Sequence, residues 1–285
     1  MTGSIGVWVE AAILGLIQGL TEFLPISSSA HLRIAGVFLP SGADPGAAFT
    51  AVTQIGTEAA VLLYFRKDIW RISMAWLSSV SAPVTGRAAE GDPADVRLAW
   101  LVAIGTLPIA ILGLTFQDAI EGALRNLYIT ATMLILFALV LGAADRWGAK
   151  RLTLDKLSWR DGILFGFAQA MALVPGVSRS GGTISAGLLL GYTREAAARY
   201  SFLLAIPAVL ASGFYQLYRD WGQFGPMGPG PTALATLISF FVGYGVIVVF
   251  LRIVSTRSYM PFVFYRVAAG VGLLALLWLG IVPAV

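Results

Sequence analysis

The sequence predicts an all-α polytopic membrane protein with an inverted-topology repeat, made of six transmembrane helices plus two re-entrant helical hairpins that meet near the midplane. Two observations predict this fold. The 285 residues are 58% hydrophobic and only 12% charged, with a mean hydropathy of +0.81, whereas soluble domains carry about 25% charged residues. In addition, one short apolar segment occurs twice, about 150 residues apart.

The repeated segment is an apolar helix that is stopped by proline and followed by hydroxyl groups. Its copies read ILGLIQGLTEFLPISSSAH (13–31) and LFGFAQAMALVPGVSRSGGT (164–183). With one residue of slippage before the proline, the alignment pairs Gly15 with Gly166, Gln18 with Gln169, Pro25 with Pro175 and Ser28 with Ser178. Broken helices in corresponding positions of two halves point to a polar site inside a membrane.

Six apolar stretches approach the roughly 18 to 20 residues needed to cross a bilayer. They are 47–65, 98–116, 127–144, 200–218, 231–251 and 262–284. Four stretches are too short to cross, and they pair into two hairpins: 9–25 with 28–40, and 162–174 with 180–191. We expect one membrane domain, 1–285, with repeat halves of about 1–150 and 151–285.

The basic residues predict the orientation, because cytoplasmic loops of membrane proteins carry an excess of lysine and arginine. With six crossings, one side receives Arg66, Lys67, Arg71, Arg87, Arg97, Arg146, Lys150, Arg151, Lys156, Arg160, Arg194, Arg199, Arg252, Arg257 and Arg266. The other side keeps Arg125 and Arg219. We therefore expect both termini outside, the first hairpin entering from outside and the second from the cytoplasm.

The second hairpin carries a candidate anion site. Arg33 and Arg179 are the two basic residues left inside the membrane, where an ionisable group is a functional hypothesis by default. Arg179 is flanked by Ser178, Ser180 and Thr183 and opens a short helix, whose free N–H groups attract anions. Its planar fork suits phosphate. The alternative is a polar turn that satisfies buried backbone, but an unpaired arginine there is costly.

The first hairpin supplies different chemistry. Gln18 and Glu22 share one helix face, and Ser27, Ser28, Ser29 and His31 follow the proline. A lone histidine is more often structural than catalytic, although here it lies close to an embedded glutamate and three serines. Glu22 by itself is also explained as a helix-capping carboxylate.

A third embedded acid, Glu58, lies inside the first full span beside Gln54 and Thr57. It either faces a cavity or pairs with Arg33 or another helix, and the sequence leaves both open. Together the hairpin tips offer a carboxylate, a hydroxyl, an imidazole and a guanidinium, a set that suits phosphoryl transfer. A carboxylate is also a ligand for a divalent cation that bridges two phosphates.

The two segments resemble the undecaprenyl-diphosphate phosphatase family of the bacitracin-resistance type. The family's first motif is matched by Gln18 and Glu22 in QGLTE, and it continues through Pro25, Ser27, Ser28 and His31. The second motif, PGxSRSxxT, is matched in full by 175–183. Weaker similarity continues at SFLLAIP (201–207) and PFVFYR (261–266), so the resemblance covers nearly the whole chain.

The resemblance implies hydrolysis of undecaprenyl diphosphate to undecaprenyl phosphate and inorganic phosphate, in the bacterial plasma membrane. It also implies a site open to the outer side, bacitracin resistance and dependence on a divalent cation, Mg²⁺ or Ca²⁺. Glu22, Ser28, His31 and Arg179 are then the catalytic residues, with the nucleophile or base left open between Ser28, His31 and water. Gln18, Ser27, Ser178, Ser180 and Thr183 are the expected substrate-binding residues, and Glu22 and Glu58 the metal ligands.

One residue departs from the family pattern, because Gln18 stands where many members have glutamate. We hypothesise that Glu58 compensates for the missing carboxylate. The rival function is a transporter or flippase of a phosphate-bearing lipid, because inverted repeats with re-entrant tips are transporter architecture. Expected partners are a polyprenyl diphosphate, membrane lipids and a second copy in a homodimer, but not nucleic acid, since the net charge is only +4.

Overall fold

The computed structural model describes residues 2–41, 44–85, 88–219 and 227–284, and this part of the chain is helical without a strand. The α-helices are α1 (Thr2–Thr21), α2 (Ser28–Phe38), α3 (Gly46–Tyr64), α4 (Arg66–Thr85), α5 (Pro93–Thr115), α6 (Gln117–Glu121), α7 (Leu127–Trp147), α8 (Trp159–Ala170), α9 (Arg179–Leu189), α10 (Arg194–Arg219), α11 (Pro229–Val254) and α12 (Met260–Trp278). Short 3-10 turns lie at Ala123–Arg125, Leu154–Lys156 and Met171–Leu173. Each of the six predicted spans coincides with a helix.

Five of the described helices are long and apolar enough to cross a membrane: α5, α7, α10, α11 and α12. A sixth candidate is α3 joined to α4, which are bent by 77° at their junction. The prediction of a polytopic, all-helical membrane protein is therefore confirmed. The last helix ends earlier than predicted, at Trp278 rather than at residue 284.

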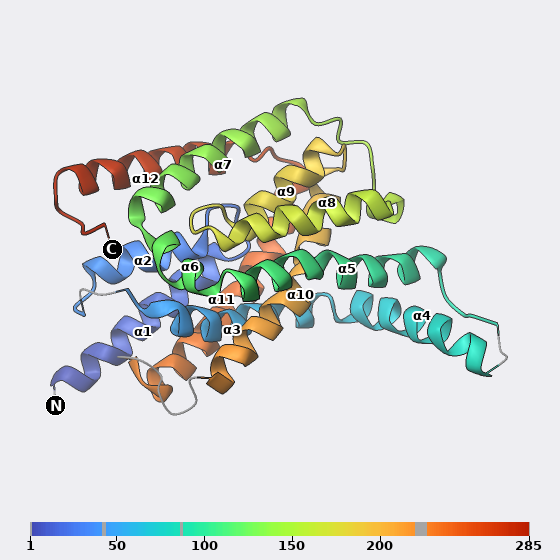
Figure 1. Ribbon diagram of the computed structural model, residues 1–285, viewed down its shortest axis with the longest axis horizontal. Helices are drawn as coiled ribbons and strands as arrows, with labels where there is room; N and C mark the ends of the chain where they lie inside the picture. Colours follow the sequence, from blue (N-terminus) through green and yellow to red (C-terminus); the bar gives the residue numbers. More distant parts are fainter. Residues whose placement is uncertain (1, 42–43, 86–87, 220–226, 285) are drawn as a thin grey trace.

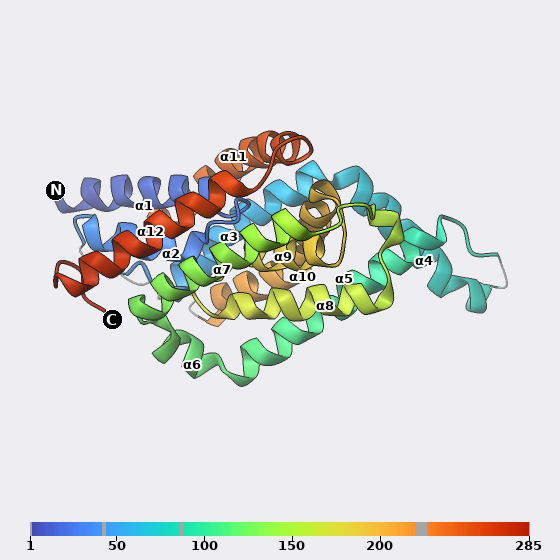
Figure 2. The ribbon, with the colours of Figure 1, turned by 90° about the horizontal axis from the view of Figure 1, so that it is seen from above.

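The α4 helix was not predicted, because residues 66–97 read as a basic loop between two spans. The first turns of this helix carry Arg66, Lys67 and Arg71, and their charge makes the segment resemble a loop although apolar residues follow. Those residues give the helix a packing face: Ile72 and Ala75 are buried, and Trp76 lies 5.7 Å, ring to ring, from Trp100 of α5. In Figures 1 and 2, α4 projects from the end of the molecule opposite the termini.

Helices of each half of the chain pack against helices of the other half. The first helix of each half, α1 and α8, packs against a long helix of the other half, α11 and α5 respectively, and α3 packs against α10 while α7 packs against α12. In Figure 1, α1 enters from the left, where both termini lie, whereas α8 starts at the right. The two short hairpins therefore begin at opposite ends of the bundle and meet inside it.

Two glycines of the sequence repeat make these close contacts. A Cβ on Gly15 would lie 2.5 Å from the carbonyl oxygen of Ala235, and a Cβ on Gly166 would lie 2.6 Å from the carbonyl oxygen of Gly105. Both distances are too short for any side chain, so each glycine lets one backbone lie directly on another. The repeat in sequence thus reflects a repeated packing contact, which brings the ends of both hairpins to the centre.

Candidate active site

Two short turns, one after α1 and one after α8, form the core of the site. Ser27 and Ser178 immediately precede α2 and α9, with φ angles of 74° and 71°, in the left-handed region that serine rarely adopts. Each hydroxyl lies close to that of the serine two residues later, at 3.3 Å in the first turn and 3.2 Å in the second. The turns are therefore built alike.

This geometry corrects the alignment of the two copies. Ser27 and Ser178 have the same separation in sequence as Gly15 and Gly166, so the repeat runs through without a slipped residue. Ser28 corresponds to Arg179, not to Ser178, and both are the first residues of their helices. The proline had suggested the slip, but the backbone conformation sets the register.

Glu22 joins the two turns. Its Oε2 accepts hydrogen bonds from Gln18 Nε2 at 2.7 Å and from Ser28 Oγ at 2.6 Å. Its Oε1 accepts one from Arg179 Nη2 at 2.7 Å, across a buried ion pair. The carboxylate is thus held in one orientation between a hydroxyl and a guanidinium, each at the N-terminus of a half-helix.

Glu58 lies on the other side of the same guanidinium. Its Oε2 is 3.8 Å from Arg179 Nη1, its side chain is fully buried, and neither of its oxygens has a hydrogen-bond partner among the described residues. Of the interpretations left open by the sequence, pairing with Arg33 is wrong, because Arg33 lies 3.4 Å from Asp44. Pairing with another helix is confirmed through Arg179 of α9, and Glu58 is not among the residues that line the cavity described below. Glu58 belongs to the site.

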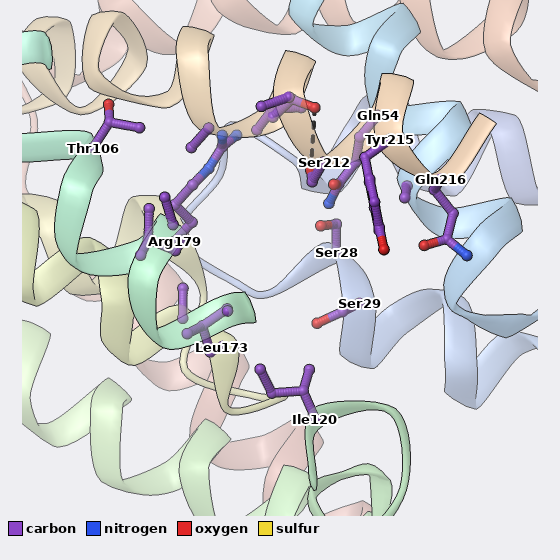
Figure 3. A pocket seen from close by; sticks show the side chains of 18 of the residues that line it. Ser28, Ser29, Gln54, Thr106, Ile120, Leu173, Arg179, Ser212, Tyr215 and Gln216 are labelled. Carbon is purple, nitrogen blue, oxygen red and sulfur yellow. Dashed lines mark hydrogen bonds between the residues drawn. The ribbon is translucent and has the colours of Figure 1, made fainter. Parts of the chain in front are cut away.

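A cavity of about 640 Å³ opens beside these residues. Figure 3 shows Ser28, Ser29 and Arg179 around one space. The polar part of the lining comprises Glu22, Ser27, Ser28, Ser29, Gln54, Thr106, Gln117, Ser178, Arg179, Ser212, Tyr215 and Gln216. The rest is mainly apolar and comes from α5 and α10, including Ile109, Leu114, Ala208 and Val209. The cavity is suited to a ligand with a polar head and an apolar chain.

His31 is not brought to Ser28 or Glu22. Its Nδ1 is 2.7 Å from the carbonyl oxygen of Ser27, and its Nε2 is 2.6 Å from the hydroxyl of Tyr265. A carbonyl oxygen only accepts hydrogen bonds, so Nδ1 carries a proton and Nε2 of the neutral ring accepts from tyrosine. Both ring nitrogens are thus engaged away from the carboxylate.

Three predicted substrate-binding residues act inside the protein scaffold. Gln18 donates to Glu22, and Ser180 donates to the carbonyl oxygen of Leu24 at 3.1 Å, linking the two turns. Thr183 is fully buried and donates to the carbonyl oxygen of Arg179 at 2.8 Å. Ser27 and Ser178, in contrast, line the cavity.

Arg266, which contacts both turns of the site, was not among the residues predicted from the sequence. The positive-inside count assigned it to the cytoplasmic end of the last span, but it is fully buried within α12 and hydrogen-bonds to both turns. Its position in PFVFYR, inside an apolar helix, was the signal that could have identified it. It should have been counted with Arg33 and Arg179.

Comparisons with known proteins match one family over nearly the whole chain. The family described as bacitracin resistance protein BacA matches residues 11–272. Similar proteins include undecaprenyl-diphosphatase 2 of Agrobacterium fabrum, 70% identical over 97% of this chain and 98% of the relative. The undecaprenyl-diphosphatases of Paenarthrobacter aurescens and Micrococcus luteus are 61% and 59% identical, each over 97% of this chain and 99% of the relative. The chain therefore belongs to the bacitracin resistance protein BacA family.

Proposed function

We propose that the protein hydrolyses undecaprenyl diphosphate to undecaprenyl phosphate and inorganic phosphate, which recycles the lipid carrier of cell-wall polymers and confers bacitracin resistance. The observation that carries this proposal is the Ser28–Glu22–Arg179 chain: a hydroxyl donates to a buried carboxylate, which is ion-paired with a guanidinium beside the cavity. The names of the relatives reported above support the same reaction.

Arg179 and the half-helix N-termini bind the diphosphate. A guanidinium presents paired N–H donors to phosphoryl oxygens, and the unpaired N–H groups that open α2 and α9 favour negative charge. When Arg179 turns to the substrate, its ion pair with Glu22 opens, and the carboxylate keeps its hydrogen bond from Ser28.

Ser28 is the proposed nucleophile and Glu22 its base. Ser28 Oγ attacks the terminal phosphorus and its proton passes to Glu22, while the bond from that phosphorus to the bridging oxygen breaks. Undecaprenyl phosphate leaves with the bridging oxygen. Water then cleaves the phosphoserine ester, Glu22 returns the proton to Oγ, and inorganic phosphate is released.

Hydrolysis is favoured over transport by this same chain of contacts. A carrier for a phosphate-bearing lipid needs the guanidinium and the helix ends, but it has no use for a hydroxyl hydrogen-bonded to a buried carboxylate. Ser28 and Glu22 meet that description at 2.6 Å. The apolar wall of the cavity fits the first isoprene units of the lipid.

The proposed membrane arrangement follows from the ends of the bundle. The helix α4, whose first turns carry Arg66, Lys67 and Arg71, projects from the end of the bundle opposite the termini, and cytoplasmic ends carry the excess of positive charge. We therefore assign α4 to the cytoplasmic side of a bacterial plasma membrane, both termini to the outside, and six crossings with two re-entrant hairpins to the fold. The site then opens to the outer side.

A divalent cation, Mg²⁺ or Ca²⁺, is the proposed cofactor. Among the described residues no group of three or more His, Asp or Glu side chains is arranged to hold a metal alone. Glu22 and Glu58 nevertheless flank one guanidinium, and Glu58 has two buried oxygens free of hydrogen bonds. Mg²⁺ is commonly held by one or two carboxylates plus substrate phosphates, so the residues fit. The cation would neutralise charge on the diphosphate.

Glu58→Gln tests the cation proposal. Because the substitution removes an oxygen ligand while keeping the shape of the side chain, we expect weaker binding of Mn²⁺, used as a spectroscopic probe, in the presence of a non-hydrolysable diphosphate analogue. Glu195→Gln on α10, outside the site, is the matched control. Equal Mn²⁺ affinity in both variants and the wild type would show that Glu58 holds no cation.

Phosphate release tests the function itself. The purified protein in detergent, given undecaprenyl diphosphate, should release one phosphate per lipid, and Arg179→Lys should release it on the order of 10² times more slowly, since one charged donor pair is lost. A well-folded wild type that binds the lipid and releases no phosphate would rule the proposal out.

A further inference from the structure

Arg266 is a fully buried arginine whose guanidinium lies between the two turns of the site. In the first turn, Nη1 donates to the carbonyl oxygen of Pro25 at 3.0 Å. In the second turn, Nη2 donates to the carbonyl oxygens of Gly176 at 2.8 Å and Val177 at 3.0 Å. Further contacts go to backbone carbonyls of α7, from Nε to Leu134 at 3.1 Å and from Nη2 to Met133 at 3.4 Å.

These contacts make Arg266 different from Arg179. Within the described part of the chain, no carboxylate pairs with Arg266, and its donors go to main-chain carbonyls alone. A main-chain carbonyl cannot be removed by rotating a side chain, so each bond fixes the plane of a peptide. A single planar group therefore sets the orientation of peptides in two segments far apart in sequence.

The three turn carbonyls depend on this one group. No other group among the described residues donates to the carbonyl oxygens of Pro25, Gly176 or Val177. Inside a membrane, an unpaired carbonyl is costly and water is scarce. Without the guanidinium both turns have to rearrange, and each contains a serine in a strained left-handed conformation that persists only when its surroundings impose it.

A glycine in the second motif makes room for the guanidinium. A Cβ on Gly181 would lie 2.6 Å from Arg266 Nη1. Gly181 also donates its backbone N–H to the hydroxyl of Ser178 at 3.1 Å, the bond that caps α9. Arg266 therefore lies directly against the N-terminal turn of the helix that carries Arg179.

We propose that Arg266 is a positioning residue for the reaction, which holds the two turns in register so that Ser28 and Arg179 meet at Glu22. It does not touch the cavity, and it acts through the carbonyls of both turns. The proposal rests on the proposed function only for its kinetic consequence. Its structural consequence, that both turns depend on one side chain, is independent of it.

The test compares Arg266→Met and Arg266→Lys with the wild type in detergent. Methionine keeps the length without the donors, and lysine keeps the charge without the planar fork. Misplacement of reacting groups by about 1 Å costs on the order of 100-fold in rate. We expect kcat to fall by about that factor in Arg266→Met, with a smaller fall in Arg266→Lys, while KM stays within about threefold because the cavity lining is intact.

Hydrogen exchange distinguishes positioning of the two turns from general destabilisation of the protein. We expect residues 22–31 and 174–183 to lose protection together in Arg266→Met, while the long helices keep theirs. If Arg266→Met does not fold, Gly181→Ala serves instead, since its new methyl group must displace the guanidinium. Gly272→Ala, on the same helix as Arg266 and with nothing within 4 Å, is the control.

Three results would overturn the proposal: turns that keep their protection, loss of protection in one turn only, or an Arg266→Lys variant equal to the wild type, which would make charge rather than geometry the cause. A wild type that releases no phosphate would reject the proposed function, and hydrogen exchange would still test the positioning.

Discussion

At the scale of single residues, the site is a carboxylate shared between a hydroxyl and a guanidinium. The sequence predicted Glu22, Ser28 and Arg179 together because they lie beside matching helix breaks. It did not predict the partner of Glu58, since sequence spacing says nothing about which helix a buried acid faces. Arg266 was missed for the opposite reason: a count of charges by loop takes any arginine near a helix end to be exposed.

His31 provides the sharpest residue-level prediction, because both of its ring nitrogens are engaged away from Glu22. In the proposed reaction Glu22 is the base and His31 only supports the Ser27 turn, so His31→Gln should cost no more than about tenfold in rate, the value of roughly one hydrogen bond. Glu22→Gln removes the base and should cost about 10²- to 10⁴-fold. Steady-state phosphate release measures the rates of both variants. Equal losses of rate would show that His31 takes part in proton transfer.

At the scale of elements, the length of the apolar runs predicted the helices well. The prolines and polar residues between those runs predicted the turns less well. The six spanning stretches became helices because their long apolar runs favour helix even where Pro108 of α5 and Pro207 of α10 each remove one main-chain hydrogen bond. The amphipathic helix α4 was not predicted, because its charged first turns resemble a loop. The register of the repeat was misjudged at Pro25 and Pro175, where two unlike sequences reach the same left-handed turn before each half-helix.

Substitution of Gly15 tests whether the repeated glycines are needed for close packing of the helices. A methyl group there would lie 2.5 Å from the carbonyl oxygen of Ala235, so α1 must move away from α11. We expect Gly15→Ala to lower the free energy of unfolding by about 1–3 kcal/mol, as overpacking does, and Gly166→Ala to do the same. Thermal unfolding in detergent measures this. Gly245→Ala on α11, with nothing within 4 Å, should lose no stability, and an equal loss there would refute the packing argument.

At the scale of the whole molecule, the helices of the two half-chains pack against one another, and each half brings one turn to a shared cavity. That arrangement explains how short hairpins from opposite ends of the bundle build a polar site in an apolar interior. Nothing in a single sequence gives the contacts between halves, and the repeat predicted only that they exist. Homodimerisation, among the partners expected from the sequence, stays a prediction.

The absence of cysteine from the sequence makes the proposed orientation directly measurable. Asp118→Cys on α6 and Glu90→Cys before α5 introduce single exposed thiols toward opposite ends of the bundle. In intact cells a membrane-impermeant maleimide should label residue 118, which lies toward the end that carries the termini. It should reach residue 90 only after permeabilisation. The reverse pattern would place the termini and the mouth of the site in the cytoplasm.

In the proposed reaction Ser28, activated by Glu22, attacks the diphosphate. The most direct measurement is phosphate release by Ser28→Ala beside Ser29→Ala, its neighbour on the same helix and on the same cavity. Among the described residues Ser29 makes no hydrogen bond to Glu22, and its hydroxyl is paired with that of Ser27. We predict a loss on the order of 10³-fold or more for Ser28→Ala, and near wild-type release for Ser29→Ala. Comparable activity in the two variants would contradict the account, because the hydroxyl on Glu22 would then take no part in the reaction.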